Sequence, residues 1–130
     1  VSMEKFNDCF TLDNKEPGNV LREACPAREV LEVLISKWTL LIIHALSDGA
    51  SRPGDLRRKI QGISEKVLSQ NLKELESRHL VTRTVFREVP PKVEYALTEL
   101  GTSLWQAANE LNRWVEQNCH FLIKDTDPSL

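Results

Sequence analysis

The sequence predicts a mainly α-helical protein with a small β-hairpin wing: a winged helix-turn-helix domain with flanking dimerisation helices. Three observations support this fold class: two short helices joined by a glycine-containing turn, a following segment rich in β-branched residues, and a long amphipathic helix near the end. A chain of 130 residues, 41% of them hydrophobic, can build one compact domain. We expect a loose arm over residues 1–24, the winged domain over 25–98, and a C-terminal dimerisation helix and tail over 99–130.

Proline placement and apolar spacing predict the first two helices. Pro26 suits the first turn of a helix that runs to about residue 36. After a turn at Ser36-Lys37, apolar residues recur at helical spacing, and Asp48-Gly49 ends the second helix. This second helix is expected to be deeply buried. Its inner face consists of Trp38, Leu41, Ile42, Ala45 and Leu46, and Leu40 and Ile43 broaden that face.

The helix-turn-helix itself is expected between residues 51 and 78. Pro53 lies in the first turn of a short third helix, which Gln61-Gly62 terminates. Ser64 is a good N-cap for a fourth helix of about fourteen residues, whose inward stripe consists of Leu68, Leu72 and Leu75. The opposite face of the fourth helix is polar, so it offers hydrogen-bond donors and acceptors to a partner.

A hairpin and a long helix complete the predicted fold. Residues 81–87 (VTRTVFR) favour a strand, and Val93, Tyr95 and Leu97 alternate in a second strand after a stiff Pro90-Pro91 tip. Thr98 is expected to cap the last helix, whose apolar stripe is Leu100, Leu104, Ala107, Ala108, Leu111, Trp114 and Val115. Such a stripe on a small domain predicts burial against a second copy of the chain.

Positive charge is concentrated in the middle of the chain. The formal net charge of the whole is -2, which argues against a polycation that coats nucleic acid indiscriminately. Residues 51–98, however, contain ten Lys and Arg against six acids, and the two flanks are correspondingly acidic. This distribution indicates a local anion-binding module, with chance clustering on a solvated surface as the alternative.

In a winged helix-turn-helix, the second helix of the pair enters the DNA major groove while the hairpin reaches phosphates or the minor groove. Gln70 can pair with adenine, Lys66 and Lys73 can reach guanine or phosphate, and Ser64 and Ser69 can bond to either. Ordinary solvated helix positions are the alternative for these residues. The candidate DNA contacts are Arg52, Arg57, Ser64, Lys66, Ser69, Gln70, Asn71, Lys73, Arg87 and Lys92.

The three cysteines, Cys9, Cys25 and Cys119, fit neither a disulfide framework nor a zinc site, so we expect free thiols in a reducing compartment. Cys25 precedes Pro26 at a predicted helix N-terminus, where the helix dipole favours a reactive thiolate. Nearby Glu23 and Glu29 oppose that thiolate, and an inert buried cap is the alternative. Cys25 is therefore a candidate redox sensor.

Six ordered motifs resemble the HxlR-type, MarR-like winged-helix regulators of bacteria. They are CP at 25–26, KWTLLI at 37–42, DLRR at 55–58, GISEKVL at 62–68, LKELE at 72–76 and VPPKVEYALTELG at 89–101, and the resemblance covers roughly residues 24–117. It implies a homodimeric transcription factor on a palindromic operator, with base reading by the fourth helix, and a cysteine at position 25 that senses thiol-reactive compounds. The chain departs from the family at Asn71, where arginine is common, at Ile35-Ser36, where a glycine pair is common, and at Pro53-Gly54.

We therefore expect a cytoplasmic regulator of transcription that binds double-stranded DNA and responds to an electrophile or another small-molecule effector. The alternative is a winged-helix module for protein–protein interaction without DNA binding. No phosphate loop, nucleophile elbow or carboxylate–histidine cluster suggests an enzyme, and no metal or cofactor is expected. The first residues, VSMEKFNDCF, lack the apolar stretch of a signal peptide, and we expect no membrane segment.

Overall fold

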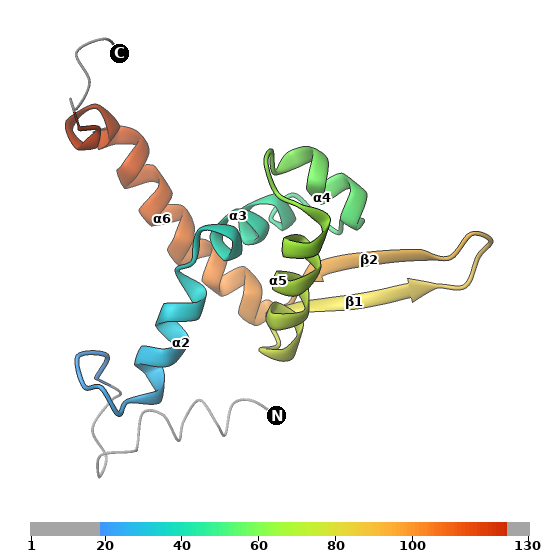
Figure 1. Ribbon diagram of the computed structural model, residues 1–130, viewed down its shortest axis with the longest axis horizontal. Coiled ribbons are helices and arrows are strands. Elements are labelled where there is room, and N and C mark those ends of the chain that lie inside the picture. The colour runs from blue at the N-terminus through green and yellow to red at the C-terminus, as the bar shows by residue number, and fades with distance from the viewer. Residues whose placement is uncertain (1–18, 125–130) are drawn as a thin grey trace.

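The computed structural model describes residues 19–124 and consists there of five helices and one antiparallel hairpin (Figure 1). The expected winged helix-turn-helix is confirmed in the order of its elements. These are α2 (Pro26–Leu34), α3 (Lys37–Leu46), α4 (Pro53–Lys59), α5 (Glu65–Ser77), β1 (Val81–Phe86), β2 (Lys92–Leu97) and α6 (Glu99–Leu122).

The expected N-terminal arm, with Cys9, lies largely outside the described residues, as does the C-terminal tail.

Hydroxyl side chains begin three of the helices. The Ser64 Oγ accepts the backbone N–H of Val67 at 3.1 Å, as predicted from its position before the leucine stripe. The Thr98 Oγ1 likewise accepts from Gly101 at the start of α6. Ser36 caps α3, which is why α2 ends at Leu34 rather than near residue 36: the residue that starts one helix cannot continue the other.

The core lies where α3, α4 and α5 meet the base of the hairpin. Leu68, Leu72 and Leu75 of α5 are buried, as the leucine stripe predicts. On α3, the expected residues Ile42, Ile43, Ala45 and Leu46 are buried, whereas Leu41, expected on the same face, is 39% exposed. The apolar residues of α3 nearly encircle the helix, so their spacing alone could not define the inward side.

The wing is a two-stranded ribbon that projects from the body (Figure 1). Its strands pair in register from Val81 with Leu97 to Phe86 with Lys92. At the base, Ser51 adds a short bridge to Tyr95 through two backbone hydrogen bonds of 2.9 and 2.8 Å. The segment before α4 is thus bonded to the wing, which fixes the wing's direction relative to the helix-turn-helix.

A tight joint connects the end of α5, the wing and α6. The Thr98 Oγ1 donates to the carbonyl of His79 at 2.7 Å, and the Thr98 backbone N–H donates to the carbonyl of Leu80. A Cβ placed on Gly101 would lie 2.1 Å from that same carbonyl oxygen. Only glycine permits this approach, so Gly101 determines how closely α6 packs on the wing base.

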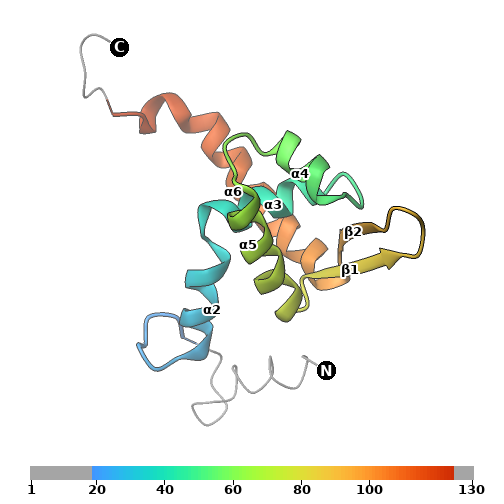
Figure 2. The same cartoon turned by 45° about the vertical axis from the view of Figure 1, so that its right-hand side comes forward.

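Two helices present apolar surface away from the core. Figures 1 and 2 show α2 and the C-terminal half of α6 extending from the body on the side away from the wing, α2 downward and α6 upward. No residue of α2 is buried. On α6, Gly101 and Ala108 are buried and Trp105 packs against the core, stacked on His44 at 4.7 Å. The rest of the predicted stripe is largely exposed, including Leu111 and Trp114.

Candidate nucleic-acid interface

The outward face of α5 presents a row of polar side chains. Lys66, Ser69, Gln70 and Lys73 are all exposed, and within residues 19–124 none of them makes an ion pair or a side-chain hydrogen bond. They share one side of the helix because positions three and four apart are neighbours on its surface. The leucine stripe on the opposite side holds this face outward. The row can therefore donate and accept hydrogen bonds to an external partner without breaking internal ones.

Two of the predicted contact residues on this segment have structural bonds of their own. Ser64 uses its oxygen to cap α5. Asn71 is half-buried and donates from Nδ2 to the carbonyl of Val67 at 2.8 Å. An amide held against its own helix has less freedom to meet a base edge, so Gln70 is better placed than Asn71 for such a contact.

Arg52 before α4 and Arg57 in its last turn add cations beside α5. Arg52 and Arg57 are exposed, and Arg57 lies 3.9 Å from Glu65 at the first turn of α5. The backbone N–H of Arg52 donates to the carboxylate of Asp55, and Arg58 pairs with that carboxylate as well. The backbone hydrogen bond is the main reason, and Arg58 a further one, that the pKa of Asp55 lies below its ordinary value of 3.8. The anionic form of Asp55 thus stabilises this helix start.

The two predicted phosphate-binding residues of the wing, Arg87 and Lys92, differ in exposure and in ion pairing. Arg87 is exposed, with no partner among the described residues. Lys92 is ion-paired with Glu94 at 2.9 Å and lies over the ring of Phe86 at 5.0 Å, so it is half-buried. An ammonium that already has an anionic partner offers less net charge to a phosphate than Arg87 does. β1 and β2 extend away from α5 to the turn that joins them (Figure 1).

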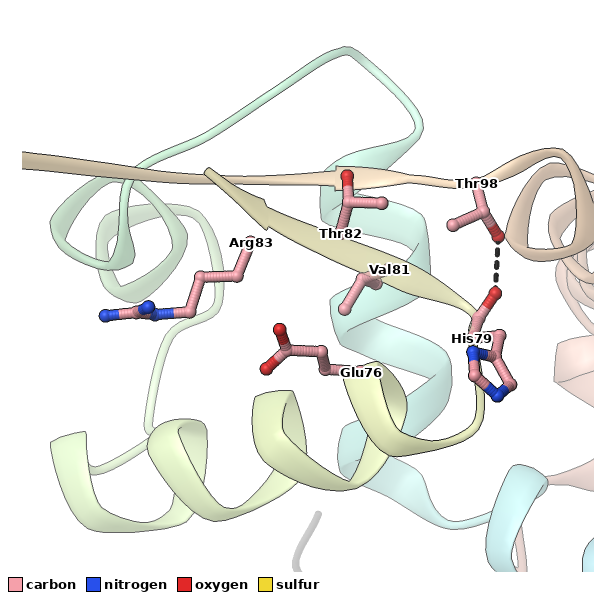
Figure 3. A pocket seen from close by; sticks show the side chains of 6 residues that line it. All are labelled: Glu76, His79, Val81, Thr82, Arg83 and Thr98. Carbon is pink, nitrogen blue, oxygen red and sulfur yellow. Dashed lines mark hydrogen bonds between the residues drawn. The ribbon is translucent and has the colours of Figure 1, made fainter. Parts of the chain in front are cut away.

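Arg83 is an exposed cation that the sequence-based set omitted. It lies on β1, where a cavity of about 380 Å³ opens between the end of α5 and the wing base (Figure 3). Glu76, His79 and Thr98 are also among its lining residues. Because side chains alternate along a strand, Arg83 shares a face with Val81, which is buried against the core. The alternation of side chains along this strand, together with the excess of Lys and Arg in residues 51–98, could have identified Arg83 from the sequence.

Cys25 occupies the N-cap position of α2, as expected, and its residue is only 9% exposed. The helix N-terminus favours a thiolate, whereas burial opposes one and restricts the access of reagents. Cys119, by contrast, is exposed on α6. Position and burial therefore act in opposite directions on the reactivity of Cys25.

The described part of the chain shows neither a cluster of metal ligands nor a membrane-spanning helix. Between residues 19 and 124, no three His, Cys, Asp or Glu side chains gather in a way that could hold a metal ion. No helix in this range is both long and apolar enough to span a bilayer.

The chain is similar to known regulators of transcription. Residues 33–122 match the model of the HxlR-like helix-turn-helix family. An HTH-type transcriptional regulator of Escherichia coli (strain K12), YtfH, is 46% identical over 101 residues, which are 78% of this chain and 80% of YtfH. The structure of the putative regulator ytfH from Salmonella typhimurium superimposes with a TM-score of 0.75 at 45% identity, over 81% of this chain and 94% of that one.

A second similar structure is that of the redox regulator HypR in its reduced form. Its TM-score is 0.69 at 36% identity, and the match covers 75% of this chain and 96% of HypR. The family model and the YtfH relative each span most of the described helix-turn-helix and wing. The chain therefore belongs to the HxlR-type family of winged helix-turn-helix transcriptional regulators.

Proposed function

We propose that this protein is a homodimer that binds a palindromic DNA operator and regulates transcription in response to a thiol-reactive or other small-molecule effector. The observation that carries the proposal is a row of exposed polar side chains along α5, at Lys66, Ser69, Gln70 and Lys73, which have no side-chain partner within residues 19–124. Two copies of α5 would enter successive major grooves about 34 Å apart.

Apolar surface supports the dimer. No residue of α2 is buried, and exposed apolar residues occur along much of the length of α6. Exposed apolar surface of this extent on a small domain is typical of an interface. A second copy that covers both helices would also set the spacing of the two α5 helices, because α6 is fixed to the wing base through Gly101.

The contacts would divide between bases and phosphates. Gln70, Lys66 and Ser69 would read base edges, with Asn71 and Lys73 beside them, whereas Arg52, Arg57 and Ser64 would meet the backbone near the first turn of α5. Arg87 would supply the main phosphate contact of the wing, and Lys92 a smaller one because Glu94 partly neutralises it.

Cys25 would be the effector-sensitive residue. HypR, a redox regulator by its description, is a structural neighbour, and Cys25 lies at a helix N-terminus. A peroxide would oxidise the Cys25 thiolate to a sulfenic acid and be reduced to hydroxide. The oxidised side chain would be larger and more polar at a residue that is only 9% exposed, so α2 would shift and change the dimer that it helps to form.

Selection of duplexes from a random pool by the full chain tests DNA binding. We expect a two-fold symmetric consensus whose half-sites lie about 10 base pairs apart, two chains per duplex by light scattering, and affinity that falls steeply with salt. A pool without enrichment, together with equal and salt-insensitive binding to every duplex, would contradict the proposal and favour the protein-interaction module.

The effector is tested with the selected duplex. Peroxide is expected to weaken binding by the wild type and by Cys119→Ser, the matched control, but not by Cys25→Ser. Equal weakening of Cys25→Ser and the wild type would remove Cys25 as the sensor and leave operator binding standing.

A further inference from the structure

The tip of the wing is apolar at the point where the molecule projects furthest from its body (Figure 1). Val89 is fully exposed, the highest fraction among the large hydrophobic residues of the described chain, and Pro90 and Pro91 after it are exposed too. Isolated exposed apolar residues are ordinary on protein surfaces. Hairpin tips, however, are usually built from Gly, Asn, Asp and Ser, so three consecutive apolar residues at a tip are unusual.

The charges around the tip do not suit a simple phosphate clamp. The connection between the strands runs from Arg87 to Pro91, and Glu88 beside Val89 would repel a phosphate. The cations lie on either side of the tip: Arg87 directly follows β1 and is exposed, and Lys92 is the first residue of β2. An apolar tip flanked by two cations can enter a groove while the cations face the phosphates along its edges.

We propose that residues 89–91 form an apolar wedge that enters the DNA minor groove and partly unstacks one base step, so that the duplex bends. This inference rests on the proposed operator binding. Apolar side chains, proline included, act in this way in minor-groove architectural proteins, where the unstacking energy is recovered through additional contacts with the bent duplex. The proline rings hold the backbone of the tip, which reduces the entropy lost on insertion.

The wedge also has a sequence preference. Pyrimidine–purine steps, TA and CA/TG, unstack at the lowest energy. We therefore expect such a step in the selected duplex at the position that the wing reaches, outside the bases that α5 contacts. Specificity at this step would arise from deformability rather than from hydrogen bonds to base edges.

The test uses the duplex selected by the wild type, with 2-aminopurine at successive positions and a dye pair at the ends. Wild-type protein at saturation is expected to raise 2-aminopurine fluorescence at one flanking step and to shorten the end-to-end distance. Val89→Thr keeps the shape of a fully exposed residue but adds a hydroxyl, and it should abolish both signals. The matched control Val85→Thr, also on the wing and 48% exposed, should keep both.

Three results distinguish the wedge from operator binding. A saturated wild-type complex without any fluorescence rise overturns the wedge while operator binding stands. Retention of both signals by Val89→Thr, or their equal loss in Val85→Thr, overturns the assignment to the tip. Failure of the pool to yield any selected duplex overturns the proposed function itself, and the wedge with it.

Discussion

At the scale of single residues, the structure separates polar side chains that are available to a partner from those that already have one. Gln70 and Arg87 are exposed with no partner among the described residues, whereas Asn71 is bonded to its own helix and Lys92 to Glu94. These existing bonds restrict the orientation of Asn71 and partly neutralise Lys92, which reduces what each can contribute to DNA affinity. The base-reading and phosphate-binding roles are therefore best tested on the first pair.

Gln70→Ala is expected to relax base preference at one operator position by about 1–3 kcal/mol, because a bidentate contact to adenine is lost. Arg87→Ala should weaken all duplexes alike and reduce the slope of log affinity against log salt by about 0.9, because one phosphate contact is lost. Anisotropy titrations with operator duplexes carrying single base-pair changes, at several salt concentrations, measure both effects. An identical loss in the two variants would contradict the division.

At the scale of elements, the hydrogen bond that begins α4 and the close packing of α6 on the wing base support the exposed polar face of α5. α4 begins with the carboxylate of Asp55 bonded to the Arg52 backbone N–H, and α6 meets the wing base where only a glycine fits. Both features act through backbone geometry, so small changes there should alter stability without touching the exposed polar row.

Asp55→Asn should lower the free energy of unfolding most at neutral pH. Because the folded-state pKa of Asp55 lies below 3.8, its ionised form contributes stability that is fully present above the unfolded-state value and is lost as pH falls through the folded value. The difference between wild type and variant should therefore be constant above about pH 5 and shrink below pH 4. Urea titrations across this range measure it, and a difference that grows on acidification would contradict the assignment.

Gly101→Ala is expected to cost about 1–3 kcal/mol of stability, because the new methyl group meets the Leu80 carbonyl and either α6 or the wing must move. Thr102→Ala, at the next and exposed position of α6, is the control and should stay near the wild type. Denaturant unfolding of the two variants gives the comparison. Equal stability of Gly101→Ala and Thr102→Ala would show that there is room for a methyl group between residue 101 and the Leu80 carbonyl.

At the scale of the whole molecule, the helices that extend from the core decide the assembly. The face of α6 that packs on its own core contains Gly101 and Ala108, with Trp105 beside them, whereas Leu111 and Trp114 remain exposed further along the helix. A single chain therefore leaves apolar surface on α2 and α6 in water, and a second copy is the occupant we propose.

Trp114→Glu should convert a dimer into a monomer, because an apolar contact becomes a buried charge. Operator affinity should fall by at least about 100-fold, since the two half-sites are no longer bound by linked copies. Glu116→Lys, at an exposed position of the same helix, is the control and should remain dimeric. Light scattering and anisotropy measure the two quantities, and a dimeric Trp114→Glu with full affinity would place the interface elsewhere.

Local chemistry in the sequence determined the elements. The caps Ser64 and Thr98, the leucine stripe of α5 and the hairpin could be predicted because a cap or a helical stripe involves residues a few positions apart. Only the tertiary structure decided that Leu41 of α3 is exposed, that Arg83 lines a cavity with Glu76, and that Cys25 is buried. These features depend on how distant segments pack, and packing selects among faces and rotamers that local spacing leaves equivalent.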